Sequence, residues 1–546
     1  MRSVPIRTVL NRTAPIRTLP MSRPGILKPS RVFLAAFVVF FGLSACWSMA
    51  TPLFAPPDET SHLVKAAATV RGEINGKKGY VLEGGIEQPT RTYRVPSAYG
   101  VDVFPCYNWN TRLTPACDKK VKRDQRLLKG HGSVSMWTTA GHYNPFYYAL
   151  VGWPSLMFKG VGGMYLIRLM SALISSLLLA GAVAIVAGWR RPGFILAGVV
   201  TAATPMVLFL NGVVNPNGIE ASSALLAWVA ALSLALQPDE RRLRTRVIAF
   251  VVAAAVLVNV RPLGYEWLAA ILAVSMLAAN KGVVSALLRH RTARRSLAVA
   301  SPAFLFGLFW TLGNGDNAKT PHNHADAFVP AAHATLNAMQ WHIEDMIGMF
   351  GFEDTMATYD IWIGAAVLLT LVGVALGTRR TSAALLAMAV GVVLIPLLAQ
   401  GFEAKHVGMA WQGRYLLAFA VGLPILAGAV LASRAERLGL PRWVDYRMAL
   451  TLSIVLACAD FAGFFRALRR YMVGMNGRLL LEPITWQPPG GWPLWVSLYA
   501  VVLGLYVALV LWPTRAALAM FPDRTAASAP GITRPRTSAS VERQGA

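Results

Sequence analysis

Residues 164–188 read MYLIRLMSALISSLLLAGAVAIVAG, an apolar run in which Arg168 is the one charged residue. A helix needs about 20 mostly apolar residues to cross the hydrocarbon core of a bilayer. Eleven more segments of the chain have this character, some of them shorter. The pattern predicts an all-α polytopic membrane protein with about 12 transmembrane helices, at 32–50, 164–188, 193–213, 219–236, 247–260, 264–280, 297–312, 360–377, 382–400, 413–433, 448–466 and 493–512.

The composition supports a membrane protein over a soluble enzyme. Of 546 residues, 55% are hydrophobic and 14% are charged, whereas a soluble domain has about 25% charged residues. The 52 Lys and Arg against 26 Asp and Glu give a net charge of +26. Such a charge can indicate nucleic-acid binding, but here the basic residues mostly form short clusters between apolar runs, as in polytopic proteins. We therefore expect a lipid bilayer as partner and no nucleic acid.

The positive-inside rule fixes the expected orientation. Residues 1–31 contain seven basic residues and no acidic one, which places the N-terminus in the cytoplasm. If residues 143–158 do not cross, the basic clusters from Arg190-Arg191 onward all face the cytoplasm, and if they do cross, all face out. The rule therefore predicts both termini inside, with 143–158 as an interfacial or re-entrant helix whose aromatic residues suit the membrane surface.

The two ends of the chain are expected to be disordered and cytoplasmic. Residues 1–31 form a basic arm that repeats Pro-Ile-Arg-Thr, and residues 513–546 form a tail rich in Ser, Thr, Pro and Arg. Residues 32–50 could instead be a cleaved signal, because Ser48-Met49-Ala50 resembles a cleavage site, but the apolar run is longer than a usual signal core. The transmembrane domain is therefore expected to span residues 32–512.

This topology leaves the chemistry to the outer face. The long first loop, residues 51–163, and a second large loop, residues 313–359, lie outside, while the inner loops are short and basic. The chain contains no P-loop and no G-x-G-x-x-G motif. An activity driven by cytoplasmic nucleotides is therefore disfavoured. In the first loop, Cys106 and Cys117 could form a disulfide in an oxidising exterior, the alternative being two free thiols.

The most informative motif is Pro56-Pro57-Asp58-Glu59-Thr60-Ser61-His62, directly after the first predicted span. The prolines favour an extended approach, and Asp58 then stands at the N-cap of a following helix with Glu59 in its first turn. Asp58 and His62 would share one face of that helix. A carboxylate beside a histidine at a bilayer surface suits a base or a metal ligand, although plain capping and a solvated imidazole explain these residues equally well.

Further polar motifs also fall on the outer face. His142 precedes an aromatic stretch and could bind a phosphate or a sugar, but an interfacial aromatic belt is the simpler interpretation. Asn215-Pro216-Asn217-Gly218, followed by Glu220, is typical of a turn and a helix start. Arg261 stands at an outer helix end. A glycine-rich stretch carries two acidic residues that could face the site, Glu353 and Asp354.

The last motif, Gln412-Gly413-Arg414-Tyr415, lies where an outer loop enters the tenth predicted span. Arginine suits bidentate recognition of a phosphate, while snorkelling to lipid headgroups is the common alternative. Each motif alone is a weak signal. Together they all fall on the face that the charge distribution had independently placed outside.

The motifs Pro-Pro-Asp-Glu-x-x-His, His-x-x-Pro-x-Tyr-Tyr, Asn-Pro-Asn, Phe-Gly-Phe and Gln-Gly-Arg-Tyr occur here in this order. In this the chain resembles the bacterial membrane family called domain of unknown function 2142, over about residues 32–512. That family resembles a branch of the GT-C glycosyltransferases, which use polyprenyl-phosphate or polyprenyl-diphosphate sugar donors and carry an essential acidic residue in the first outer loop.

The resemblance implies roles for individual residues. Asp58 is then the candidate base, and Glu59 its neighbour or a metal ligand. Gln412, Arg414 and Tyr415 match the family's last motif. The family often has Asn-Pro-Asp where this chain has Asn215-Pro216-Asn217, so the carboxylate is missing there and Glu220 is a candidate replacement.

The resemblance implies a glycosyltransferase in the bacterial inner membrane, with a glycan or lipid acceptor on the outer face. Arg414, helped by Arg261 or His142, would stabilise the departing phosphate, and Asp58 would take the acceptor proton. No cofactor is required, because arginines can supply the positive charge. A divalent metal ion remains an option, with Asp58, Glu59 and His62 as candidate ligands.

Three alternatives compete with this prediction. A transporter or flippase of a lipid-linked glycan would also be polytopic, but it predicts inverted repeats and charges near the bilayer midplane, and no clear repeat is present. An O-antigen-type polymerase or ligase is scarcely distinguished from the transferase by sequence. A purely structural protein would not need Asp58, Glu59 and His62 together at one membrane mouth.

Overall fold

The computed structural model describes residues 28–83, 86–100, 105–108, 110–118, 132–314, 327–350, 358–478 and 483–520. Most of the arm and the tail predicted at the two ends of the chain lie outside these ranges. The predicted boundaries do shift, however. Helix α2 (Pro29–Ala50) begins within the predicted arm, and α23 (Trp492–Met520) continues through Pro513 into the predicted tail.

The described part of the chain is mostly helical, and ten of its helical segments are long and apolar enough to cross a bilayer. It is an integral multi-pass membrane protein, as predicted. In the last third of the chain one span is made of three short pieces, η4 (Gly413–Leu416), α20 (Leu417–Ala420) and α21 (Gly422–Ala435). The others are α2, α8 (Val161–Val186), α11 (Pro216–Leu236), α12 (Glu240–Val260), α15 (Arg291–Asn314), α18 (Tyr359–Leu376), α19 (Arg379–Val407), α22 (Arg442–Val473) and α23.

Two of the twelve predicted spans are helical but differ from a full-length helix. The segment 193–213 consists of α9 (Pro192–Ala202) and α10 (Pro205–Asn211), which are bent by 68°. The break falls at Pro205, which cannot donate a backbone hydrogen bond to the preceding turn. Helix α13 (Gly264–Ala278) is shorter than the spanning helices. The described residues therefore contain ten spans, or eleven if the bent pair counts as one, where the sequence predicted about twelve.

The first loop contains a small β-sheet that the sequence analysis did not predict. Strands β1 (Lys77–Glu83), β2 (Ile86–Pro96) and β3 (Ser133–Thr138) pair in antiparallel fashion in the order β1-β2-β3. Along β2, the side chains of Tyr93 and Val95 are both buried, as the period-2 alternation of a strand requires. The prediction of an all-α protein is therefore wrong for this loop. A search for long apolar runs does not detect strands that bury only one face.

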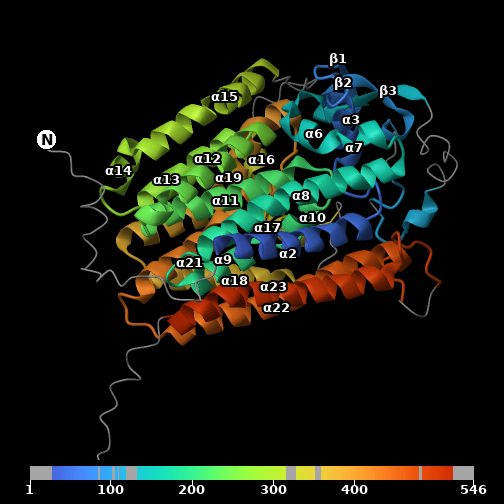
Figure 1. The fold of residues 1–546 in the computed structure, drawn as a ribbon. Coiled ribbons are helices and arrows are strands. Elements are labelled where there is room, and N and C mark those ends of the chain that lie inside the picture. The colour runs from blue at the N-terminus through green and yellow to red at the C-terminus, as the bar shows by residue number, and fades with distance from the viewer. Residues whose placement is uncertain are drawn as a thin grey trace, which may run out of the picture.

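Short helices complete the loops between the spans. The segment 143–158 forms α6 (Pro145–Gly152) and α7 (Pro154–Met157), and neither is among the candidate spans. Figure 1 places these helices and the sheet at one end of the helix bundle and α14 at the other. The remaining short elements are α3 (Glu59–Thr69), η1 (Ser97–Tyr99), η2 (Pro115–Cys117), η3 (Thr139–His142), α14 (Val283–Arg289), α16 (Phe328–Asn337) and α17 (Met339–Gly348).

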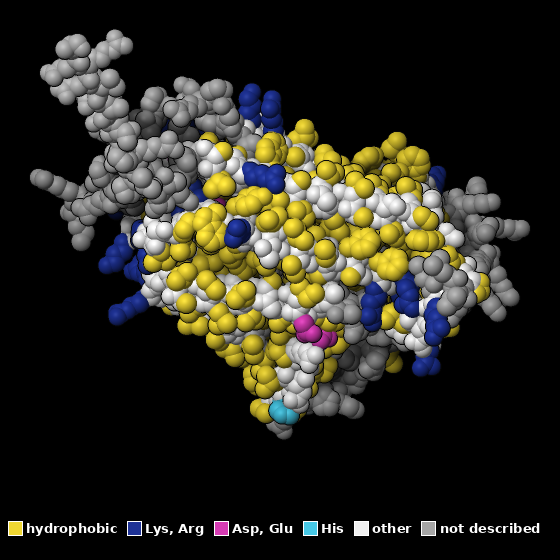
Figure 2. Space-filling view, turned by 90° about the horizontal axis from the view of Figure 1, so that it is seen from below, with side chains coloured by type: hydrophobic (Ala, Val, Ile, Leu, Met, Phe, Trp, Pro, Cys, Tyr) yellow, Lys and Arg dark blue, Asp and Glu magenta, His cyan; other side chains and the backbone are white. Residues whose placement is uncertain are grey.

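The spanning helices differ in how deeply they are buried. In the apolar window of α11, 94% of the residues are buried inside the protein, whereas only 6% are buried in α15. Helix α11 packs against α8, α12, α13 and α21, so it forms the centre of the bundle. Seen from below in Figure 2, hydrophobic side chains cover most of the surface, and Lys and Arg gather mainly towards its two ends. This distribution matches a lipid-facing exterior between two charged interfaces.

Helices α9 and α21 pack closely through glycines on both sides. A Cβ atom added to Gly198 would lie 2.3 Å from the carbonyl oxygen of Pro424, and one added to Gly428 would lie 2.3 Å from that of Phe194. Small residues allow such close backbone approach between helices in membranes, where lipid tails compete with apolar side chains. These glycines therefore set the α9–α21 distance.

We predict that Gly198→Ala lowers the free energy of unfolding by about 1–3 kcal/mol, because the added methyl group overpacks a backbone contact. The control is Gly504→Ala in α23, where an added Cβ meets no atom within 4 Å. Thermal unfolding of the purified proteins in detergent should show a lower midpoint for the first variant alone. Equal midpoints for both variants would contradict the assigned packing.

Candidate active site

Asp58 and Arg414 meet at the start of α3, although 356 positions separate them in the sequence. Asp58 adopts a left-handed backbone conformation with φ of 60° and does not cap the helix that begins at Glu59. Its Oδ2 atom instead accepts a hydrogen bond of 2.8 Å from Nη2 of Arg414. The side chain of Asp58 is 45% exposed, whereas that of Arg414 is 3% exposed. The first and last motifs thus form one ion pair that is open on the carboxylate side.

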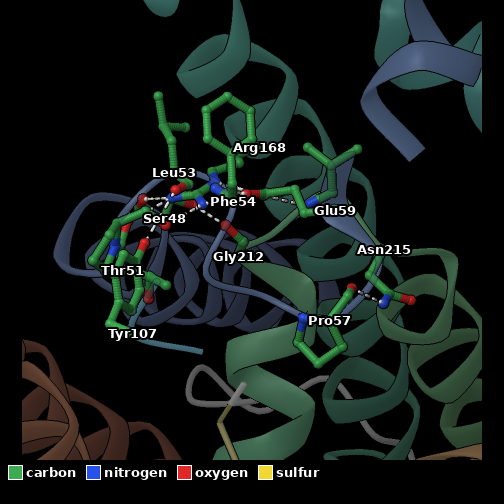
Figure 3. Close-up of polar contacts among 12 residues, drawn as sticks. Ser48, Thr51, Leu53, Phe54, Pro57, Glu59, Tyr107, Arg168, Gly212 and Asn215 are labelled. Atoms are coloured by element: carbon green, nitrogen blue, oxygen red, sulfur yellow. Dashed lines mark hydrogen bonds and ion pairs between the residues drawn. The ribbon is translucent and has the colours of Figure 1, made fainter. Parts of the chain in front are cut away.

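Glu59 points into the protein, towards Arg168 (Figure 3). Its two oxygens accept hydrogen bonds of 2.7 and 2.5 Å from Nε and Nη2 of Arg168, and both side chains are fully buried. The same carboxylate accepts hydrogen bonds from the backbone N–H groups of Phe54 and Val214. Glu59 is therefore fully engaged, and its contacts are those of a residue that fixes the loop.

Arg168 completes this network and was not among the predicted site residues. Its guanidinium also donates hydrogen bonds to the carbonyl oxygens of Ser48, Thr51 and Pro52, at 2.7–2.9 Å. These carbonyls belong to the end of α2 and the turn after it. A single arginine inside an otherwise apolar run was the available signal, because a charge within the membrane needs a partner.

The Asn-Pro-Asn motif supports the same loop from the other side. Asn215 caps α11 by accepting a hydrogen bond from the N–H of Asn217, and its Nδ2 donates to the carbonyl of Pro57 at 3.1 Å. Figure 3 shows this contact beside the Glu59 network. Asn215 thus holds the residue before Asp58. The Asn217 side chain is buried.

Arg261 and Glu220 form a second buried ion pair. Nη1 of Arg261 lies 3.2 Å from Oε2 of Glu220, and the two side chains are 7% and 2% exposed. The guanidinium of Arg261 stacks over the ring of Tyr415, 4.6 Å from its centroid, and lies 5.9 Å from that of Tyr143. Arg414 lies 5.3 Å from the same Tyr415 ring. Tyr415 therefore contacts both arginines and connects the two ion pairs.

His62 is buried on the next turn of α3. Its Nδ1 lies 2.9 Å from the hydroxyl of Tyr148. Burial lowers the pKa of His62 to about 3, the field of Asp58 opposing this shift and those of Arg261 and Arg414 adding to it. The imidazole is therefore neutral near pH 7, and it can donate or accept a hydrogen bond without adding a charge to the site.

His142 approaches the same region from η3. Its ring lies 4.4 Å from that of Tyr143, centroid to centroid, and its carbonyl accepts a hydrogen bond from Nε1 of Trp310 in α15. The preceding residue, Gly141, is held by fully buried Lys65, whose Nζ donates to the Gly141 carbonyl at 3.0 Å. Burial lowers the pKa of Lys65 to about 7. Sequence reasoning missed Lys65, which no motif marked.

The Gln412–Tyr415 motif is shaped by α17. A Cβ atom on Gly413 would lie 1.9 Å from the carbonyl oxygen of His342, so a side chain has no room there. Asp345, which is buried, accepts a hydrogen bond of 3.0 Å from the N–H of Arg414. Burial raises the pKa of Asp345, and the charge of Arg414 opposes that shift. Asp345 was not predicted. The Oε1 atom of Gln412 is buried and has no hydrogen-bond partner among the described residues.

Other predicted residues lie elsewhere. Glu353 and Asp354 fall in 351–357, outside the described residues. Phe350, just before them, packs its ring 4.5 Å from that of Trp47 in the core. The sulfur atoms of Cys106 and Cys117 are joined in a disulfide, with 6.3 Å between the Cα atoms.

The candidate metal ligands do not form a metal site. No group of three His, Cys, Asp or Glu side chains suited to a metal ion occurs in the described part of the chain. Of the three candidates, Glu59 is engaged by Arg168, and the Nδ1 atom of His62 lies against Tyr148. Asp58 faces an arginine, and a positive neighbour opposes cation binding. The donor set does not fit a divalent ion held by these three residues.

A family model described as "Predicted membrane protein (DUF2142)" matches residues 41–423. The chain belongs to this family. The matched range contains every site residue described above, from Asp58 to Tyr415. No curated protein matches the chain.

Two solved structures of ArnT from Cupriavidus metallidurans are similar to the chain. The structure bound to undecaprenyl phosphate is 15% identical, with a TM-score of 0.41, and the match covers 90% of this chain and 78% of ArnT. The apo structure is 14% identical, with a TM-score of 0.40, and the match covers 90% and 77%.

We predict that Arg168→Met destabilises this family member by about 3–5 kcal/mol, because it leaves the Glu59 carboxylate buried without its partner. The matched control is Arg190→Met, which breaks an ion pair with Glu436. The side chains of Arg190 and Glu436 are 50% and 36% exposed, and exposed ion pairs contribute little to stability. Folded yield and thermal midpoint in detergent report the difference. Equal folded yields and thermal midpoints of the two variants would show that Arg168 does not hold the loop in place.

We also predict a pH effect from His62. Since its folded pKa of about 3 lies below the ordinary value near 6.5, the unfolded chain binds a proton between these limits and the folded chain does not. Stability should therefore fall as pH drops below about 6.5, by about 2 kcal/mol from this residue at pH 5.

The loss of thermal stability between pH 7 and pH 5 should accordingly be smaller in His62→Gln than in the wild type. His333→Gln, at an exposed position on α16, should keep the wild-type loss. An unchanged pH dependence in His62→Gln would show that the histidine is not buried in its neutral form.

Proposed function

We propose that the protein is an integral-membrane glycosyltransferase of the inner membrane. It would transfer a sugar from a polyprenyl-phosphate donor to a glycan or lipid acceptor of the cell envelope. The reaction would take place at the outer face, where the positive-inside rule puts the first loop. The observation that carries the proposal is the Asp58–Arg414 ion pair, because it unites a partly exposed carboxylate with a buried guanidinium.

The guanidinium suits the leaving phosphate of a glycosyl transfer, and the carboxylate suits the acceptor hydroxyl. A guanidinium matches the oxygens of a phosphate and stabilises the charge that develops as the phosphate leaves. A carboxylate within reach of water can take a proton from an acceptor hydroxyl. Arg414 and Arg261 both lie against the ring of Tyr415, and the ring of His142 lies beside that of Tyr143.

In the proposed step, the acceptor oxygen attacks the anomeric carbon as the bond from that carbon to the phosphate oxygen breaks. The sugar passes through an oxocarbenium-like state. Asp58 takes the acceptor proton, and the polyprenyl phosphate departs with its charge against Arg414. Attack opposite the leaving group inverts the anomeric centre. Glu59 has no chemical role here and fixes the position of Asp58 through Arg168.

We predict that Asp58→Asn and Arg414→Gln each lower sugar transfer at least about 100-fold, since a general base and an electrostatic stabiliser each contribute that much or more. In a strain lacking the gene, plasmids carrying these variants should fail to restore the missing surface glycan, measured by mass spectrometry at equal protein level. Glu436→Gln, which alters an exposed ion pair with Arg190, should restore it.

Restoration of the glycan by both site variants would contradict the proposal and favour a transporter of a lipid-linked glycan. Proteoliposomes then separate the two classes. A flippase moves a labelled lipid-linked glycan across the bilayer without an acceptor, whereas a transferase forms product only when donor and acceptor are both present.

A further inference from the structure

The Asp58–Arg414 pair has an uneven environment. Arg414 is 3% exposed, and Asp58 is 45% exposed. A buried guanidinium requires an anion at all times, since an uncompensated buried charge is costly. A carboxylate that is nearly half exposed can instead turn into water at small cost. The arginine is therefore the fixed member of the pair and the aspartate is the replaceable one.

The backbone conformation of Asp58 supports the same conclusion. The residue has φ of 60° and its side chain does not cap α3. Both features cost free energy, since left-handed backbone is strained for a residue with a side chain and an N-cap aspartate normally bonds the first turn. Asp58 gives up its usual local bond and reaches across to Arg414.

Two of the other carboxylates in this region pair with different arginines, and the third bonds the backbone of Arg414. Glu59 is held by both oxygens on Arg168, and Glu220 is paired with Arg261. Asp345 is buried and accepts the backbone N–H of Arg414. Among these residues, Asp58 is the carboxylate that both pairs with the Arg414 side chain and has access to solvent.

From this asymmetry, and resting on the proposed function, we infer that Asp58 and the donor phosphate compete for Arg414. Before the donor binds, Asp58 neutralises the buried guanidinium and is held there. When the donor arrives, its phosphodiester takes over the Arg414 hydrogen bonds and Asp58 is released towards the acceptor side. The base is thus set free by binding of the donor, and a carboxylate and a phosphate never need to share one arginine.

The competition makes an unusual prediction about binding. Removal of the Asp58 charge should strengthen phosphate binding while it abolishes transfer, whereas a residue that helps to bind the phosphate would weaken binding when replaced. Asp58→Asn suits the test because asparagine tolerates the left-handed backbone and has nearly the same size.

The experiment titrates dodecyl phosphate into the purified full-length protein in an uncharged detergent and measures the dissociation constant by calorimetry. We expect Asp58→Asn to bind about tenfold more tightly than the wild type, and Arg414→Gln to bind at least about tenfold more weakly. The double variant should match Arg414→Gln, because Asp58 acts on the phosphate through the arginine. Glu436→Gln, an acid paired with Arg190 and Arg442, should bind like the wild type.

The outcomes separate this inference from the proposed function. If Arg414→Gln loses binding but Asp58→Asn binds as the wild type or more weakly, the competition is overturned while the phosphate site stands. If Arg414→Gln binds like the wild type, the phosphate does not rest on Arg414, and both the competition and the proposed site fail. Thermal midpoints of the four variants, measured in the same detergent, confirm that each protein titrated is folded.

Discussion

The candidate site depends on the buried ion pair between Glu59 and Arg168, which fixes the loop that carries Asp58. The pair joins the start of α3 to α8, to the turn after α2 and to the segment before α11 through hydrogen bonds that use both side chains fully. Such a pair adds little net stability, because desolvation offsets the attraction. Its effect is geometric. With Glu59 fixed, the preceding residue, Asp58, is placed within reach of Arg414.

A second constraint is the balance of charge at the site. Arg414 and Arg261 are both buried, and both lie against the ring of Tyr415. Each of these arginines has a carboxylate partner. His62 adds no charge near neutral pH. The pairs differ in exposure, since Glu220 is buried with Arg261 whereas Asp58 is open to water. Arg261 is thus held permanently, and Arg414 is the cation that can accept a new anion.

The sequence predicted the helical fold well, because a chain inside lipid must satisfy every backbone hydrogen bond within its own helices. Apolar runs therefore report spans directly, including the run around Arg168. Hydropathy does not resolve a bend such as that at Pro205, nor a short helix such as α13, so the described residues contain ten or eleven full spans where about twelve were predicted. It also missed the small sheet around Tyr93, where alternation rather than a long run carries the signal.

The candidate site was predictable where a motif marked it, as for Asp58 and Arg414. Their mutual contact was not, since nothing in the local sequence relates positions so far apart. For the same reason, the sequence did not reveal the residues that bond Glu59 and Arg414. Arg168 was noticed only as a charge inside a span, and Asp345 looked like an ordinary loop residue. Glu59 shows the opposite case. Its position next to Asp58 in the sequence suggested a shared chemical role, while its carboxylate is held by the buried Arg168.

The most direct test of the account is an electron cryo-microscopy structure of the purified protein bound to a polyprenyl phosphate. We expect the phosphate within hydrogen-bond distance of the Arg414 guanidinium, with the Asp58 carboxylate turned away from it towards solvent and Glu59 still bonded to Arg168. A phosphate bound elsewhere, with the Asp58–Arg414 pair intact, would contradict it.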